Sequence, residues 1–291
     1  MYLIFDTETT GLPRSWKAPI TDVENWPRCV QIAWQLYDEM GVLIEQKDFL
    51  IRPDGFDVPY EVEKIHGIST ALALQKGHDI AEVIAEFKSA IEKTSFLVGQ
   101  NVGFDVNVWG CEFHRFEEDL EWTKFKVLDT CTEKTAELCQ LPGGRGGKFK
   151  LPNLTELHQY LFQESFGEAH NATADVEATS RCFLELLRKE HYSLIELQQS
   201  GSYFADFQTA NPSTIQPLGL KHLNLKEESA KLVQIEAKEP QINTHTDVDL
   251  STSSFAHLHN HTQFSVLEST TKIQSMIDRA VEFNMPAVAI T

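Results

Sequence analysis

Three strand-like apolar runs at the start of the chain limit the folds that it can adopt. Residues 1–5, 30–37 and 42–52 are rich in apolar, β-branched and aromatic residues, and Met40-Gly41 stands as a turn between the last two. Such runs predict buried strands. The chain therefore begins with a strand-rich segment rather than with a helical bundle.

Helical periodicity follows this strand-rich start. Apolar residues at positions 80, 83, 84, 87 and 91 have the spacing of an amphipathic helix. Further elements are expected as a short strand at 96–98, a helix from about 104, helices at 130–139 and 153–162, and a last helix that ends near 190. Strand–helix alternation of this kind predicts an α/β sheet with helices on its faces.

The domain organisation is expected to have three parts. The folded pattern covers residues 1–190, after which Gln, Ser, Thr, Asn, Pro and Glu dominate residues 191–254 and predict a partly disordered linker. At residues 255–291 a strand, a helical stripe and a second strand return. One such βαβ unit is too small to bury its own core, so we expect the chain to be the front piece of a longer polypeptide.

The composition and charge of the chain limit the classes of protein to which it can belong. Apolar runs do not exceed four or five residues, which predicts no membrane span, and the N-terminus lacks the features of a signal peptide. Five scattered cysteines indicate reduced thiols and a cytoplasmic location. The formal net charge of −18 argues against electrostatic binding of nucleic acid by this chain alone.

Acidic residues follow two of the predicted strands and start the last helix. Asp6 and Glu8 share one face of the first strand, because residues i and i+2 of a strand point the same way. Two such carboxylates repel each other unless a cation lies between them, and Mg²⁺ or Mn²⁺ prefers oxygen ligands. Asp105, His170 and Asp175 occur later. The alternatives are a solvated acidic turn, a surface histidine and helix-start acids.

Taken together, three segments resemble the DnaQ-like (DEDDh) family of 3′→5′ exonucleases. They are FDTETTG (5–11), NVGFD (101–105) and HNATAD (170–175), and the resemblance covers about residues 1–190. The position of His170, five residues before Asp175, favours the histidine subgroup over the tyrosine subgroup. The resemblance implies a ribonuclease H-like fold, with a central mixed sheet that has three antiparallel strands first and helices on its flanks.

The resemblance also implies roles for individual residues. Two Mg²⁺ or Mn²⁺ ions, roughly 3.5–4 Å apart, would be held by Asp6, Glu8, Asp105 and Asp175. His170 would be the general base that takes a proton from the attacking water. Candidate substrate contacts are Thr9, Thr10, Gly11, Leu12, Phe104 and His66. Core packing for Phe104 and a local structural role for His66 remain the alternatives.

The C-terminal segment HLHNHTQFSVLES (257–269) resembles the first motif of PHP domains. His259 and His261 match the H-x-H metal ligands of that motif, on one face of a strand. The later ligands of a PHP site are absent, so this metal motif is incomplete and no working site is expected here. The order of exonuclease, linker and PHP start resembles the N-terminal part of a bacterial DNA polymerase III alpha subunit with a built-in proofreading exonuclease.

The predicted function is a metal-dependent 3′→5′ exodeoxyribonuclease that acts on single-stranded or frayed DNA 3′ ends. The polymerase domains in cis would hold the duplex, so the acidic nuclease needs little affinity of its own. Two alternatives stay open, a stand-alone RNA-trimming nuclease and a non-catalytic docking module for polymerase partners. A sliding-clamp peptide is a further candidate at Gln216–Leu220, although Gly219 stands where a large apolar anchor is expected.

Overall fold

The computed structural model describes residues 1–118, 120–166, 171–220, 223–236 and 273–285. The chain divides into two compact units, Met1–Ala237 and Lys238–Thr291. In the second unit the described part is essentially helix α10 (Ile273–Glu282), as its apolar stripe predicts. The two strands expected beside α10 lie outside the described residues. No described helix combines the length and the apolar character that a membrane crossing requires.

A five-stranded mixed sheet forms the centre of the first unit. Its strands are β1 (Tyr2–Thr9), β2 (Cys29–Tyr37), β3 (Leu43–Leu50), β4 (Phe96–Gly99) and β5 (Lys126–Asp129), in the order β3-β2-β1-β4-β5. The first three strands pair antiparallel, and β4 and β5 continue the sheet in parallel with β1. The mixed sheet that the resemblance implied is therefore confirmed.

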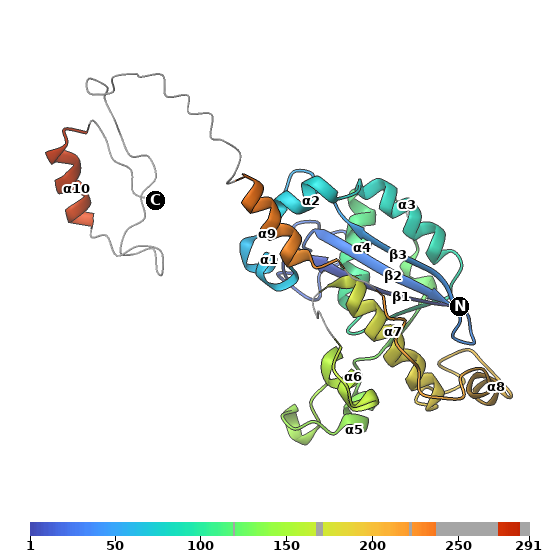
Figure 1. The fold of residues 1–291 in the computed structure, drawn as a ribbon. Helices are drawn as coiled ribbons and strands as arrows, with labels where there is room; N and C mark the ends of the chain where they lie inside the picture. Colours follow the sequence, from blue (N-terminus) through green and yellow to red (C-terminus); the bar gives the residue numbers. More distant parts are fainter. Residues whose placement is uncertain (119, 167–170, 221–222, 237–272, 286–291) are drawn as a thin grey trace. The chain divides into compact units, whose positions relative to one another are not determined.

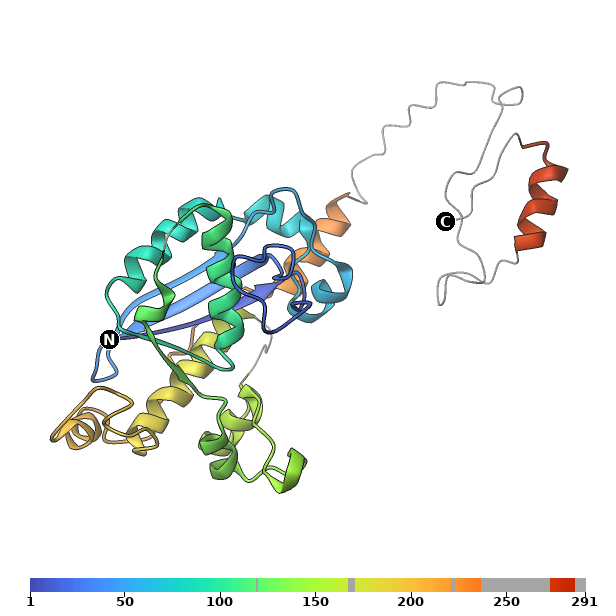
Figure 2. The same cartoon turned by 180° about the vertical axis from the view of Figure 1, so that it is seen from behind.

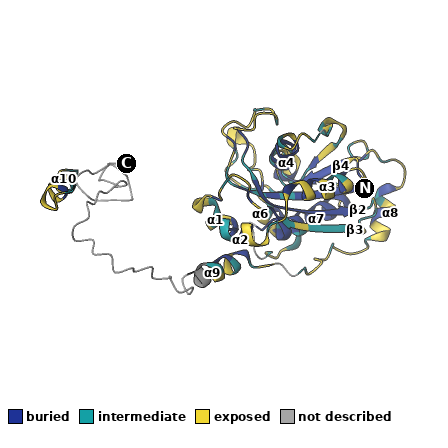
Figure 3. Ribbon diagram, turned by 90° about the horizontal axis from the view of Figure 1, so that it is seen from above, coloured by how far each residue is buried: buried dark blue, intermediate teal, exposed yellow. Residues whose placement is uncertain are grey.

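Helices cover both faces of this sheet (Figures 1 and 2). In chain order they are α1 (Tyr60–His66), α2 (Thr70–Lys76), α3 (Ile80–Ile91), α4 (Gly103–Arg115), α5 (Glu133–Cys139), α6 (Leu154–Phe162), α7 (Ala172–Arg188), α8 (Tyr203–Ala210) and α9 (Leu225–Glu236). Helices α3 and α4 pack on one face, and α6, α7 and α8 pack on the other. Buried residues are concentrated in the strands and on the inward sides of the helices (Figure 3).

Strand β1 is buried from its first residues because helices cover it on both sides. Leu3 and Phe5 pack with the residues of α3 and α4. Tyr2 and Ile4 pack with those of α7. This alternation continues to the end of the strand, so Asp6 and Glu8 follow the α7 side. The carboxylates therefore emerge where the first apolar strand meets the start of α7.

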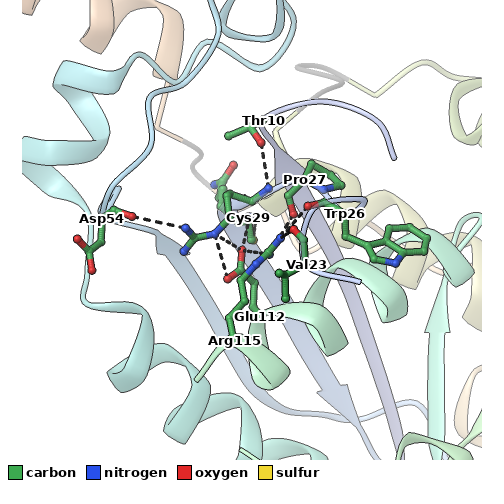
Figure 4. Close-up of polar contacts among 10 residues, drawn as sticks. Thr10, Val23, Trp26, Pro27, Cys29, Asp54, Glu112 and Arg115 are labelled. Carbon is green, nitrogen blue, oxygen red and sulfur yellow. Dashed lines mark hydrogen bonds and ion pairs between the residues drawn. The ribbon is translucent and has the colours of Figure 1, made fainter. Parts of the chain in front are cut away.

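Residues 10–28 form a long loop that is fixed to α4. Glu112 of α4 is fully buried, and its Oε1 accepts hydrogen bonds from Arg28 Nε at 3.0 Å and from the backbone N–H of Cys29 at 2.9 Å. Arg115 pairs with the same carboxylate at 3.1 Å and donates to the carbonyl oxygens of Val23 and Trp26 at 2.7 Å each. Figure 4 shows these contacts around Glu112 and Arg115. The loop is thus held by the helix that carries Asp105 in its first turn.

The sequence predicts a linker over 191–254, and the structure differs over the described part of that segment. In α8, Tyr203 and Phe207 are buried in the core on the α7 side, and the hydroxyls of Tyr203 and Tyr2 are 2.9 Å apart. In α9, Ser229 Oγ accepts from the backbone N–H of Ser69 at 3.1 Å. Buried aromatic and hydroxyl groups give these helices tertiary partners. The functional boundary of the exonuclease domain stays a prediction.

Candidate functional site

Three carboxylates meet where β1 ends and α7 begins. Asp6, Glu8 and Asp175 each offer one oxygen, and these oxygens all lie within 4.8 Å of one another. Asp175 reaches this point because it lies in the first turn of α7, whose N-cap residue Asn171 accepts a hydrogen bond from the backbone N–H of Thr173 at 3.1 Å. All three side chains are partly buried.

Asp105 approaches the same corner from the first turn of α4. Its Oδ1 accepts two hydrogen bonds from Thr7, one from the backbone N–H at 2.9 Å and one from the hydroxyl at 2.6 Å. Thr7 stands between Asp6 and Glu8 on β1, so Asp105 is tied to the strand that carries both. The structure thus brings three of the four predicted carboxylates into one cluster and holds the fourth against their strand.

The electrostatics of the cluster indicate an excess of negative charge. Burial, followed by the charges of Asp105, Asp175 and Glu8, raises the pKa of Asp6 well above its ordinary value. Burial and the charges of Asp175 and Asp105 raise the pKa of Glu8 to about 8. Burial raises the pKa of Asp105 to about 7, against the lowering effect of the Thr7 hydrogen bonds.

This donor set fits a divalent cation. The ligand atoms are carboxylate oxygens, which hard cations such as Mg²⁺ and Mn²⁺ prefer. A cation among them would offset the repulsion that raises the pKa values of Asp6 and Glu8. The described residues hold no other group of three or more acidic, histidine or cysteine side chains that close together.

Gln31 lies at the candidate site, although none of the sequence motifs includes it. It lies on β2 directly opposite Glu8 and is almost completely buried. Its Oε1 accepts a hydrogen bond from the backbone N–H of Ala172 at 3.2 Å, and its Nε2 donates to Asp48 Oδ1 at 2.9 Å. Gln31 therefore holds the start of α7 beside β1. A polar residue within the otherwise apolar run CVQIAW is the signal that could have found it.

The predicted substrate contacts Thr9–Leu12 lie at the end of β1 and at the start of the following loop, where Thr9 and Thr10 form hydrogen bonds. Thr9 Oγ1 donates to the carbonyl oxygen of Gly11 at 2.7 Å. The backbone N–H of Thr10 donates to the carbonyl of Arg28 at 2.9 Å, and Thr10 Oγ1 accepts from the N–H of Arg28 at 2.9 Å. Leu12 is 74% exposed. Both threonines are thus used in holding the loop, and Leu12 is free to contact a substrate.

The other predicted residues differ in surroundings. His66 is buried at the end of α1, and its Nδ1 accepts from the backbone N–H of Ile68 at 3.1 Å, which is a local structural role. Phe104 is partly buried, packs against the core of α3 and α4, and contacts Trp16 with ring centroids 5.7 Å apart. His170, His259 and His261 lie outside the described residues. Their predicted roles stay predictions, as do the substrate contacts.

Comparison with known proteins assigns the family. The sequence profile of the exonuclease family matches residues 3–183, which include all three motifs and the four carboxylates. The chain belongs to the exonuclease family. A second profile, that of the PHP domain, matches residues 257–291, so the exonuclease is followed by PHP-domain sequence, in the order that the motifs predicted.

Relatives of this exonuclease include two DNA polymerases III of the PolC type. The one from Streptococcus mutans serotype c is 27% identical over 227 residues, which are 77% of this chain and 14% of the relative. The one from Streptococcus pyogenes serotype M2 is 30% identical over 193 residues, which are 65% of this chain and 12% of the relative. The chain thus spans about one seventh of the length of these relatives.

Solved structures with the same fold include exonuclease I. One is described as suggesting how processivity is achieved, and it superimposes with a TM-score of 0.51 at 24% identity. Another is the zinc-ion-bound form of an E. coli ExoI–ssDNA complex, with a TM-score of 0.51 at 26% identity. Each comparison covers 65% of this chain and 40% of the other. The ribonuclease H-like exonuclease fold is confirmed.

Proposed function

We propose that this exonuclease hydrolyses DNA from the 3′ end, one nucleotide at a time, with two Mg²⁺ or Mn²⁺ ions. The observation that carries the proposal is the cluster of Asp6, Glu8 and Asp175, whose oxygens lie within 4.8 Å of one another at the end of β1. Asp105 completes the ligand set from α4. Each hydrolysis releases a nucleoside 5′-monophosphate.

In the proposed reaction, some residues bind the cations and others position these ligands. Bound divalent cations would stabilise negative charge on the scissile phosphate and the departing 3′ oxygen. Asp6, Glu8, Asp105 and Asp175 bind the cations, while Thr7 fixes the carboxylate of Asp105 through its two hydrogen bonds. Gln31 fixes the start of α7, on which Asp175 lies.

His170 supplies the general base in this proposal. It lies five residues before Asp175 in the motif HNATAD. An imidazole, with an ordinary pKa near ~6.5, is suited to accept a proton from the attacking water at neutral pH. The proton then leaves the reaction through solvent.

A role in proofreading is favoured by the domain order. The exonuclease precedes the start of a PHP domain, and relatives of the PolC type are DNA polymerases III. Polymerase domains in cis would keep the nuclease at high effective concentration near the primer end. This arrangement also offsets the net charge of −18, which is unfavourable for binding DNA without help. Such a protein would work in the cytoplasm.

The DNA substrate is favoured over RNA by the relative that was solved with single-stranded DNA. A frayed or mispaired 3′ end suits a single-strand site, because little further unpairing is needed. The proposal does not extend to a sliding clamp. In Gln216–Leu220 the backbone N–H of Gly219 donates to Glu177 Oε1 of α7 at 2.9 Å, so this segment lies on α7.

Primer–template duplexes test the proofreading role. The purified chain with Mg²⁺ is expected to shorten a primer with a mismatched 3′ end faster than a matched one, and DNA faster than RNA of the same sequence. Equal or faster decay of RNA would replace this proposal by RNA trimming. Absence of cleavage of any substrate with both Mg²⁺ and Mn²⁺ would contradict the nuclease proposal and favour a docking module.

A further inference from the structure

One tryptophan of this chain is exposed beside the candidate site. The side chain of Trp16 is 57% exposed, whereas Trp26, Trp34 and Trp109 are buried in the core, and Trp122 is partly buried against it. The ring of Trp16 lies 5.7 Å from that of Phe104, with an interplanar angle of 51°. Phe104 directly precedes Asp105. An exposed indole thus extends an aromatic surface away from the carboxylates.

The backbone on both sides of Trp16 is fixed in place. Asn25 is buried, and its Oδ1 accepts from the backbone N–H of Ser15 at 2.7 Å while its Nδ2 donates to the carbonyl of Ser15 at 3.0 Å. Farther along the loop, Trp26 Nε1 donates to the carbonyl of Pro19 at 3.1 Å. The loop is also bound to α4 through Glu112 (Figure 4). Trp16 is therefore exposed on a loop whose backbone is held in place by hydrogen bonds on both sides of it.

Close packing between the loop and α4 also holds the loop that carries Trp16 in place. Gly110 of α4 leaves room for the loop, because a Cβ there would lie 3.3 Å from Ile20 Cγ2 and 3.4 Å from the indole of Trp122. A glycine at this point of the helix lets residues 10–28 lie close against α4. The distance between Trp16 and the start of α4 is thereby set by packing as well as by hydrogen bonds.

Two cationic residues lie close to Trp16 in the sequence. Arg14 and Lys17 stand on either side of Trp16 in the sequence, and neither forms an ion pair with a described residue. Single-strand binding sites combine cations along the phosphates with aromatic rings on which bases stack. A protein partner would require neither feature next to Asp105.

We propose that Trp16, supported by Phe104, stacks on a base of the bound DNA strand upstream of the terminal nucleotide. Arg14 and Lys17 lie along the adjoining phosphates. The inference rests on the proposed exonuclease function and adds the site that holds the strand. Stacking tolerates any base, because every base has a π-face. Stacking on Trp16 and Phe104 would therefore contribute affinity for DNA without sequence preference.

Binding without turnover separates this inference from the nuclease activity. A dye-labelled oligo-dT is titrated with the full chain in Ca²⁺, and fluorescence anisotropy gives the Kd. Trp16→Ala is expected to weaken binding about 5- to 150-fold, the usual range for loss of one stacked base. Trp16→Phe should restore most of the affinity. Ile195→Ala, which removes another exposed apolar side chain, should leave the Kd unchanged.

Abasic oligonucleotides locate the stacked base. In a series with one abasic position each, the wild-type chain should lose affinity mainly at one position, and Trp16→Ala should lose nothing further there. Equal Kd values for wild type, Trp16→Ala and Trp16→Phe would contradict base stacking on Trp16. If the wild type still cleaved DNA in that case, the proposed nuclease activity would stand. A wild-type chain that neither binds nor cleaves DNA would overturn the nuclease itself, and base stacking on Trp16 with it.

Discussion

Thr7 donates both its backbone N–H and its hydroxyl to Oδ1 of Asp105, at 2.9 and 2.6 Å. These two bonds join the strand that carries Asp6 and Glu8 to the helix that carries Asp105. They also favour the ionised form of Asp105, against burial, which raises its pKa to about 7. Thr7, which lies between two of the predicted metal ligands, thus positions the carboxylate of a third.

Replacing Thr7 by valine should weaken metal binding and activity. The shape of the side chain is nearly kept, but the hydroxyl bond to Asp105 is lost, and a bond to a charged group contributes about 1.5–3 kcal/mol. We expect the Mg²⁺ concentration for half-maximal cleavage to rise about tenfold or more. Thr7→Ser keeps the hydroxyl and should behave as wild type. An unchanged Mg²⁺ requirement in Thr7→Val would contradict this role.

The stability of the metal-free protein should fall as pH rises. The folded-state pKa values of Glu8 and Asp105 are raised to about 8 and about 7, so the folded chain binds these protons more tightly than the unfolded chain. Their contribution is present at low pH and is lost as pH rises through 7 and 8. We expect the free energy of unfolding in EDTA to fall by several kcal/mol between pH 5 and pH 9, on the order of 7 kcal/mol if both groups contribute fully.

Urea denaturation at several pH values measures this effect. Asp105→Asn should reduce the decline, because Asn Oδ1 can still accept from Thr7 while the charge is gone. Added Mg²⁺ should stabilise the wild type at pH 8 and stabilise Asp105→Asn less, because ligands bind only the folded cluster. A pH dependence that is the same in both chains would show that the carboxylates do not repel one another as inferred.

Gln31→Ala should reduce activity without comparable loss of the fold. The substitution removes the acceptor for the N–H of Ala172 and loosens the start of α7, on which Asp175 lies. We expect cleavage at fixed Mg²⁺ to fall about tenfold or more, since small displacements of reacting groups are costly. Gln35→Ala, at an equally buried glutamine of β2 that bonds Tyr37, is the matched control. Equal activity in the two variants would contradict a positioning role for Gln31.

Glu112→Ala should destabilise the first unit strongly. Glu112 is fully buried, and its loss leaves Arg28 and Arg115 without their carboxylate. Breaking a buried ion pair by removing one partner costs about 3–5 kcal/mol. Glu121→Ala removes an exposed carboxylate that pairs with Lys124 and should cost at most about 1 kcal/mol. Thermal unfolding of the two variants compares them, and similar losses would contradict the anchoring role of Glu112.

Much of the fold could be predicted because apolar periodicity reports burial. The strands that became β1 to β4 and the helix that became α3 follow from their apolar spacing. Strand β5 was missed because Lys126–Asp129 is short and half-exposed, which leaves little pattern. Helices α1, α2 and α8 were missed because each has only seven or eight residues and draws its stability from tertiary contacts.

The candidate site, too, could be predicted from the sequence only in part. Carboxylates at strand and helix ends were visible because acidic residues directly after apolar runs stand out. The bond between Thr7 and Asp105 was not, because it joins residues 98 positions apart. The same holds for Gln31, whose partner Ala172 lies 141 positions away. A single sequence does not show the partner in such a long-range hydrogen bond, although a polar residue in an apolar strand, such as Gln31, marks a position that needs one.

Cleavage of a labelled DNA strand tests the central claim most directly. A single-stranded oligonucleotide labelled at its 5′ end is incubated with the chain and Mg²⁺, beside Asp6→Asn and a sample with EDTA. We predict a ladder that shortens by one nucleotide from the 3′ end, lost in both controls. Release of the 5′ label as a mononucleotide, internal cuts, or cleavage that persists in Asp6→Asn would contradict a 3′→5′ exonuclease that depends on these carboxylates.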